Sequence, residues 1–414
     1  MTVRIPLTPE LEGIRHYLHE HPERSFREFN TTTYLKKLLR DHGNIVIRDD
    51  PMKSGLVADI VGTKPVADIV EDGTAARDAD TIPATEATLD RKTKAGHPVV
   101  GLRADIDGLP VTEPEHNNPV SLNEGVMHAC GHDIHMASLV GAAFYLADHT
   151  DDFAGTVRLF FQPAEETGEG AKHMIAAGLT DGLDVMVGTH NNPNYKPDQV
   201  AVGVEPMMAG CIKFNVTLTG TGTHGGYPEK GRSPIEAMAS MVLSLQTIVS
   251  RNETPFHPLV VSVTAVHGGD VWNVIPQEAG FQGTVRYFYP DDGRMAGARF
   301  RSIVTQTAAA YGIHADIDWE DLQEPVQSDA KLAEIIADDV PSYARIAPIR
   351  PSMAGEDFIE YSHRCPVVFA FIGSNGTANC ADWHSPAFLG LDASVATGAS
   401  FYANAALRLL EVLA

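Results

Sequence analysis

Short apolar runs that end in polar residues recur between residues 96 and 192. They are HPVVGLRADIDGLP (97–110), GTVRLFFQPAEE (155–166) and LDVMVGTHNNP (183–193), with helical segments between them. Strands that alternate with helices predict an α/β layer with a mainly parallel sheet. In such a layer, reactive side chains collect at the carboxyl ends of the strands.

A different pattern fills residues 207–322. The segment CIKFNVTLTGTG (211–222) alternates apolar and polar residues, as an antiparallel strand with one solvated face does. Three more strands are expected at 258–269, 278–289 and 314–320, and helices at 233–250 and 294–311. These elements predict a smaller α+β module with a four-stranded antiparallel sheet and two helices.

The α/β pattern resumes at residue 323 and closes with a helix over 393–414. A chain of 414 residues is too long for one ordinary core. We therefore predict an α/β fold in which a main domain, 1–206 and 323–414, has helices on its sheet and is interrupted by the module at 207–322. The Ala-, Asp- and Thr-rich segment 66–96 is expected to be a solvated excursion.

Charge and composition exclude several classes of partner. The chain has 31 basic and 54 acidic residues, a net charge of −23, which argues against nucleic acid and anionic membrane surfaces. There is no apolar segment near the start of the sequence, and no run of about 18 apolar residues, so we expect a cytoplasmic protein. The four cysteines are scattered, which disfavours a disulfide scaffold.

The stretch MHACGHDIHM (127–136) concentrates possible metal ligands. Five lie within eight positions: His128, Cys130, His132, Asp133 and His135. Residues two apart diverge by about 200° on a helix, so Cys130 and His132 can converge only in a loop. We expect that loop to be followed by a helix near residue 137. A thiolate and an imidazole suit zinc and similar divalent metals.

Two adjacent carboxylates follow the strand at 155–162. Glu165 and Glu166 come directly after an apolar run, where unpaired carboxylates would be costly. Metal-assisted hydrolysis uses two neighbouring carboxylates, since one can bind the metal while the other takes a proton from metal-bound water. A storage or structural metal site would need only one.

Eight segments in order resemble one family. They are LHEHPERSFREFNTT, LRADIDGLP, MHACGHDIHM, QPAEETGEGAKHMIAAG, GTHNNP, NVIPQEAGFQGTVR, AGEDF and WHSPAF. Together they are similar to the binuclear metal-dependent amidohydrolases that include hippurate hydrolase, N-acyl-amino-acid aminoacylases and plant auxin–amino acid conjugate hydrolases. The resemblance spans nearly the whole chain and implies a catalytic α/β domain with a smaller lid.

The resemblance also implies roles for single residues. The metal ligands would be Cys130, His132, Glu166, His190 and His384. They would hold two divalent ions per subunit, zinc or manganese, with cobalt or nickel as alternatives. Glu165 would be the general base and Asp107 would brace the ligands, which leaves His128, Asp133 and His135 in supporting positions.

In the lid, the resemblance implies that His224, Asn273 and Arg286 contact substrate and that the lid forms a homodimer or higher homo-oligomer. Four residues of the lid depart from the family pattern: Glu229, Tyr287, Trp272 and His267. Substrate choice is therefore the property that the resemblance predicts least. The expected reaction is hydrolysis of the amide bond of a small N-acyl amino acid. A dipeptidase or carboxypeptidase on the same scaffold, and a non-catalytic metal- or ligand-binding protein, are the alternatives.

Overall fold

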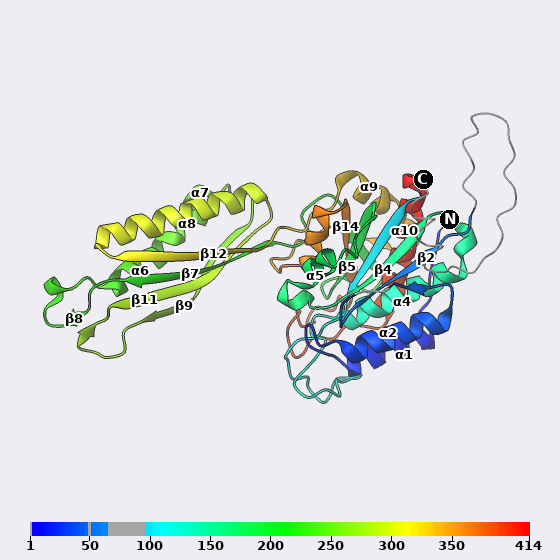
Figure 1. The fold of residues 1–414 in the computed structure, drawn as a ribbon, viewed down its shortest axis with the longest axis horizontal. Helices are drawn as coiled ribbons and strands as arrows, with labels where there is room; N and C mark the ends of the chain where they lie inside the picture. Colours follow the sequence, from blue (N-terminus) through cyan, green and yellow to red (C-terminus); the bar gives the residue numbers. More distant parts are fainter. Residues whose placement is uncertain (1, 49–50, 65–96) are drawn as a thin grey trace. The chain divides into compact units, whose positions relative to one another are not determined.

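The computed structural model describes residues 2–48, 51–64 and 97–414, so the expected excursion at 66–96 lies outside the described residues. The chain divides into two compact units, drawn as ribbons in Figure 1. The first unit consists of Met1–Glu205, Gln327–Ile349 and Glu360–Ala414. The second unit consists of Pro206–Val326 and Arg350–Ile359.

The first unit is built on a mixed sheet, which has eight strands within the described residues. In spatial order they are β1 (Val46–Ile47), β2 (Leu56–Val61), β4 (Thr156–Gln162), β3 (Val99–Asp105), β5 (Val185–Asn192), β14 (Val367–Gly373), β6 (Gln199–Val202) and β13 (Arg345–Ile346). The pairings β4–β3, β3–β5, β5–β14 and β6–β13 are parallel, and the other three are antiparallel. This arrangement confirms the predicted α/β class, with antiparallel pairings added on both sides of the parallel centre.

Helices cover one face of this sheet around a shared apolar core. Side chains of five helices join the core with inward residues of the strands: α1 (Pro9–Glu20), α2 (Phe29–His42), α4 (His132–Asp148), α9 (Ala330–Asp339) and α10 (Ala393–Leu413). Helix α4 is buried along nearly all of its length and packs between α1 and α10. The short helix α5 (Gly170–Ala176) follows β4, and its Met174 contacts the hydroxyl of Tyr361.

Four single-turn 3₁₀ helices and one longer 3₁₀ segment complete the described structure. They span Thr150–Asp152, Glu165–Thr167, Pro228–Lys230, Val340–Ser342 and Asp357–His363. Among the helices that the structure describes, none has the length and hydrophobicity needed to cross a membrane.

The register of the parallel strands determines where the polar ends meet. Asp105, the last residue of β3, pairs with Gln162, the last residue of β4, and β5 runs parallel beside β3. The carboxyl ends of β3, β4 and β5 therefore lie at the same edge of the sheet, and the predicted site residues of these segments follow at that edge.

The second unit contains a four-stranded antiparallel sheet in the order β12 (His314–Gln323), β7 (Gly210–Thr219), β11 (Glu278–Tyr287) and β9 (Leu259–Gly268). Helices α6 (Pro234–Leu245), α7 (Thr247–Asn252) and α8 (Pro290–Tyr311) pack on its apolar face. Where the sequence predicted one helix over 233–250, the structure has two, because the helix is interrupted at Gln246 between α6 and α7. A separate ribbon pairs β8 (Thr223–His224) with β10 (Val274–Ile275).

Candidate metal centre

The turn before α4 brings Cys130 and His132 together. Gly131 has φ +83°, a left-handed conformation that glycine adopts without strain, and α4 begins at His132. The expectation that the helix begins near residue 137 is therefore wrong. The left-handed glycine turns the chain between the two side chains, so they converge although His132 is already helical.

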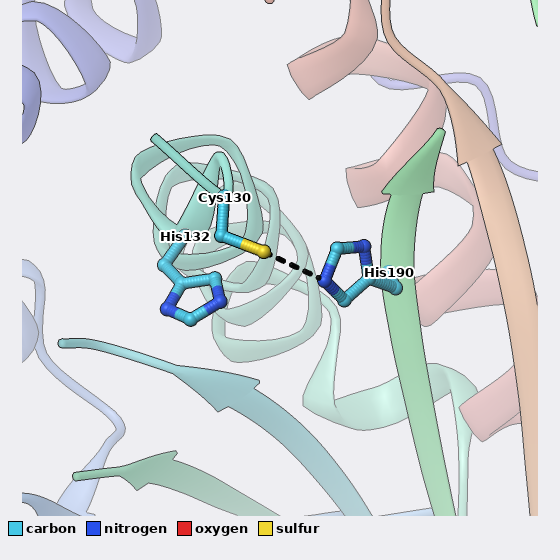
Figure 2. Close-up of side chains that lie close together, drawn as sticks. All are labelled: Cys130, His132 and His190. Carbon is cyan, nitrogen blue, oxygen red and sulfur yellow. Dashed lines mark hydrogen bonds between the residues drawn. The ribbon is translucent and has the colours of Figure 1, made fainter. Parts of the chain in front are cut away.

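Cys130, His132 and His190 form a first group of possible ligands. Their ligand atoms all lie within 4.8 Å of one another, and all three residues are buried. The Cys130 Sγ lies 3.3 Å from the His190 Nε2, and Figure 2 shows the thiol directed at that ring. Three donors from two segments about 60 residues apart thus meet at one point.

Backbone carbonyls orient both imidazoles of this group. The Nδ1 atom of His132 lies 2.8 Å from the Asp107 carbonyl oxygen, and the Nδ1 atom of His190 lies 2.7 Å from the Asn191 carbonyl oxygen. Each Nδ1 therefore carries the proton and donates it, which leaves Nε2 as the metal-binding atom. The His132 Nε2 is buried and has no hydrogen-bond partner among the described residues, as expected of a ligand atom.

Cys130, Glu166 and His384 form a second group, again with ligand atoms within 4.8 Å of one another. The His384 Nε2 lies 3.4 Å from a Glu166 carboxylate oxygen. His384 has φ +63°, uncommon for a residue other than glycine, and its backbone N–H donates to the Ala129 carbonyl. Because Cys130 belongs to both groups, the structure brings all five expected ligands together.

The Asp107 carboxylate holds the backbone of the two adjacent glutamates in place. It accepts the backbone N–H of Glu165 at 3.2 Å and that of Glu166 at 3.1 Å, and the Ser25 hydroxyl donates to it at 2.6 Å. The Glu165 carboxylate is buried and lies 3.9 Å from the His132 Nε2. The expected base thus sits beside the ligands, with its backbone fixed by the expected brace.

The charges of the site favour a bound cation. Burial alone would lower the pKa of His132, but the carboxylates of Asp105 and Asp107 raise it to about 10. Burial raises the pKa of Glu166 to about 7, against the opposing charge of His132. Burial lowers the pKa of His190 well below its usual value. Buried carboxylates that stabilise positive charge at this point, beside imidazole and thiol donors, fit a divalent metal of the zinc type.

Asn191 supports the site, a role that the sequence motifs did not predict. The Asn191 side-chain amide donates to the Cys130 carbonyl at 2.5 Å, and its carbonyl accepts from Ser374 at 2.9 Å and from Trp383 at 3.4 Å. Asn191 therefore links the segments that carry Cys130, His190 and His384. A buried polar residue directly after His190 was the available signal for it.

The three remaining polar residues of MHACGHDIHM all lie around the ligands. His135 contacts the Asp105 carboxylate at 2.5 Å and accepts the Asn191 backbone N–H at 2.7 Å. Asp133 forms a buried ion pair with Arg15 at 2.8 Å. His128 is 1% exposed, and burial lowers its pKa to about 4.

The expected substrate contacts all lie in the second unit. His224 pairs with Val274 in the β8–β10 ribbon, and the Gly225 N–H donates to the Asn273 carbonyl at 2.7 Å, so His224 and Asn273 are neighbours. Arg286 lies on β11, where its Nε donates to the Thr284 hydroxyl at 3.2 Å. These contacts describe the second unit by itself.

A thiol, imidazoles and adjacent carboxylates at the carboxyl edge of a largely parallel sheet are typical of a metallohydrolase. Residues 101–408 match the sequence profile of peptidase family M20/M25/M40. The chain therefore belongs to this family and is a metal-dependent hydrolase of amide bonds, which confirms the resemblance found in its motifs.

Individual relatives match over nearly their whole length. The chain is 36% identical to the N-acetyl-L-cysteine deacetylase of Bacillus subtilis (strain 168), over 98% of this chain and 89% of that protein. It is 32% identical to the hippurate hydrolase of Campylobacter jejuni, over 98% of both. The crystal structure of the Bacillus subtilis YXEP protein, described as a dinuclear metal binding peptidase of the M20 family, has a TM-score of 0.81, 31% identity and coverage of 97% and 98%.

Proposed function

We propose that the chain hydrolyses the amide bond of N-acyl amino acids and releases a carboxylic acid and a free amino acid. The observation that carries this proposal is the position of Glu165. Its carboxylate is buried beside the ligand groups, while Asp107 holds its backbone N–H. A site that only stored a metal would give no reason for a second buried carboxylate there. The relatives that act on N-acyl amino acids by name support the substrate class.

We further propose that Cys130, His132, Glu166, His190 and His384 hold two divalent cations. The two ligand groups that share Cys130 support this number, as does the dinuclear neighbour. Zinc or manganese is the proposed metal, and cobalt or nickel would fit the same donors. Two such cations polarise the scissile carbonyl and lower the pKa of the attacking water when they are bound.

The proton transfers fall to Glu165 in this proposal. Its carboxylate takes a proton from the water as the water oxygen attacks the carbonyl carbon. Glu165 then gives that proton to the amide nitrogen as the carbon–nitrogen bond breaks, so the amine leaves neutral. Asp107 keeps Glu165 and Glu166 in fixed directions throughout, because it accepts both of their backbone N–H groups.

The second unit would contribute recognition. We propose that Arg286 pairs with the substrate carboxylate, as a guanidinium can do in a bidentate manner, and that His224 and Asn273 contact the amide. Arg286→Met should therefore raise KM more than it lowers kcat. We also propose that the second unit forms a homodimer. Light scattering after gel filtration measures the molar mass, which should be twice that of one chain.

Glu165→Gln tests the proposed base. The substitution keeps the size of the side chain but removes its basicity, so turnover should fall by a factor of about 10² to 10⁴. Metal content, measured by mass spectrometry, should stay as in the unmodified chain. Glu169→Gln is the matched control, since Glu169 is half exposed and lies three residues beyond Glu166, directly before α5. Full activity of Glu165→Gln would refute the role of Glu165.

A substrate panel tests the class. N-acetyl-L-cysteine, hippurate and other N-acyl amino acids should be hydrolysed faster than dipeptides or peptides with a free amino end. Faster cleavage of dipeptides, or of the C-terminal residue of longer peptides, would favour a dipeptidase or carboxypeptidase. Metal binding without any hydrolysis would favour a binding protein.

A further inference from the structure

Three consecutive backbone N–H groups in the turn after β4 donate to two buried carboxyl groups. The N–H groups of Glu165 and Glu166 donate to Asp107. The preceding N–H, that of Ala164, donates to the Glu28 carboxylate at 2.9 Å. Asp107 was expected to brace the site, whereas nothing in the sequence motifs gave Glu28 a role.

Ala164 needs this support because of its backbone conformation. Its φ is +56°, in the left-handed region, which costs about 1–2 kcal/mol for a residue with a Cβ. This conformation turns the chain from the end of β4 into the short helix Glu165–Thr167. The direction in which Glu165 leaves the strand therefore depends on a conformation that the residue does not favour alone.

The same Glu28 oxygen stabilises a second residue of this kind. It accepts the backbone N–H of Phe26 at 3.0 Å, and Phe26 has φ +60°. The Glu28 carboxyl is fully buried, and burial together with the negative charge of Asp107 raises its pKa to about 7. Burial of a carboxyl is costly without strong hydrogen bonds, and the two backbone N–H donors, together with the Ser54 side chain, supply them here.

We propose that Glu28 is a positioning residue for hydrolysis: it holds Ala164 in the left-handed turn and thereby aims the Glu165 carboxylate. This inference rests on the proposed role of Glu165 as the base. Glu28 would act on Glu165 through the backbone N–H of Ala164 and not by contact with the substrate. A misplacement of a reacting group by about 1 Å can reduce turnover about 100-fold, so a small rotation of this turn would be measurable.

A carboxyl with a merely structural role would affect stability and nothing else. Glu28 is also the residue before α2, where its carbonyl accepts from Thr32, so a loss of stability is expected on any account. Glu23 offers a matched control, because its carboxylate accepts the Thr31 backbone N–H at 2.8 Å near the same helix end. The bonds that it makes do not involve residues 164–166.

The experiment compares Glu28→Met, Glu28→Gln and Glu23→Met in the metal-loaded chain. Glu28→Met fills the same space without an acceptor, and kcat should fall 10- to 100-fold with KM within about twofold and metal content unchanged. Glu28→Gln keeps an acceptor oxygen and should retain kcat within about threefold. Glu23→Met should lower the melting temperature and leave kcat unchanged.

Hydrogen exchange provides a readout that does not depend on catalysis. The amides of residues 164–166 should exchange faster in Glu28→Met than in Glu28→Gln, while Glu23→Met leaves them unchanged. If Glu28→Met does not fold, Glu28→Asp replaces it, because the shorter carboxylate keeps the charge but draws back from Ala164. Its kcat should fall likewise.

Several results would overturn the inference. These are an unchanged kcat in Glu28→Met or in its replacement, equal losses in Glu28→Met and Glu28→Gln, or an equal loss of kcat in Glu23→Met. Failure of the proposed function looks different, since Glu165→Gln would then remain active. An inactive Glu165→Gln with a fully active Glu28→Met would reject Glu28 alone.

Discussion

His19 links α1 to the start of α4 and should make the stability of the chain depend on pH. Its side chain is buried, with Nδ1 3.0 Å from the Asp133 carboxylate and Nε2 3.0 Å from the Glu113 carboxylate. Asp133 directly follows the expected ligand His132 in α4. We consider His19→Asn, which leaves a donor near the Nδ1 position but cannot titrate and cannot reach Glu113 as the ring does.

The magnitude follows from the pKa of His19. Burial alone would lower this pKa, but the charge of Asp133 and hydrogen bonds to Asp133 and Glu113 raise it from 6.5 to about 9. A folded-state pKa above the unfolded value stabilises the fold below pH 6.5, and this stabilisation is lost as pH rises to about 9. At about 1.4 kcal/mol per pKa unit, the shift corresponds to at most about 3.5 kcal/mol.

Urea unfolding between pH 6 and pH 9.5 measures the effect. The free energy of unfolding of the unmodified chain minus that of His19→Asn should fall by about 2–3 kcal/mol across this range. Taking the difference cancels groups common to both chains, such as His132. His42→Asn is the control, since it removes an exposed pair with Asp148 and should change stability by less than about 1 kcal/mol at every pH. A difference for His19→Asn that does not vary with pH would refute the reasoning.

Three further predictions concern the site and its surroundings. Asn191→Asp places an acceptor against the Cys130 carbonyl and should weaken metal binding about 10- to 100-fold in a chelator competition; unchanged affinity would contradict the linking role of Asn191. Metal removal by a chelator should lower the melting temperature, because the buried His132 Nε2 then loses its partner, and an unchanged melting temperature would argue against a bound metal. Arg158→Met leaves the Asp59 carboxylate buried with one of its two guanidinium partners gone, and should cost about 3–5 kcal/mol in urea unfolding; a loss below about 1 kcal/mol would contradict it.

The sequence predicted the architecture well because hydrophobic periodicity reports burial directly. The runs ending near Asp105, Gln162 and His190 are parallel neighbours, so their polar ends do meet. The change to alternation after residue 206 marks the second unit, whose strand β7 alternates buried and more exposed side chains. Periodicity does not show where a helix is interrupted, and for that reason the sequence did not predict the division of α6 from α7 at Gln246.

The polar residues that meet at the site, Asp107 among them, are visible in the sequence, but Glu28 and the left-handed turns that support them are not. Adjacent glutamates after a strand and a cysteine near histidines are visible in the sequence. Glu28 lies 136 residues from the N–H that it accepts, and no local pattern connects the two. The left-handed conformations of Gly131 and Ala164 are equally hidden, because one depends on a loop and the other on a distant carboxyl.

The groups that orient the site are largely backbone atoms. Carbonyl oxygens of Asp107 and Asn191 receive the imidazole N–H groups of His132 and His190, and the Ala129 carbonyl receives the His384 backbone N–H. Backbone N–H and carbonyl groups are alike in every residue except for the missing N–H of proline. A sequence motif can therefore identify a metal ligand, but it cannot identify the backbone group that orients it. Two side chains outside the ligand set hold such backbone segments in place: Asn191 bonds the Cys130 carbonyl, and Glu28 bonds the Ala164 N–H. Substitution of Asn191 should therefore weaken metal binding, and substitution of Glu28 should lower turnover.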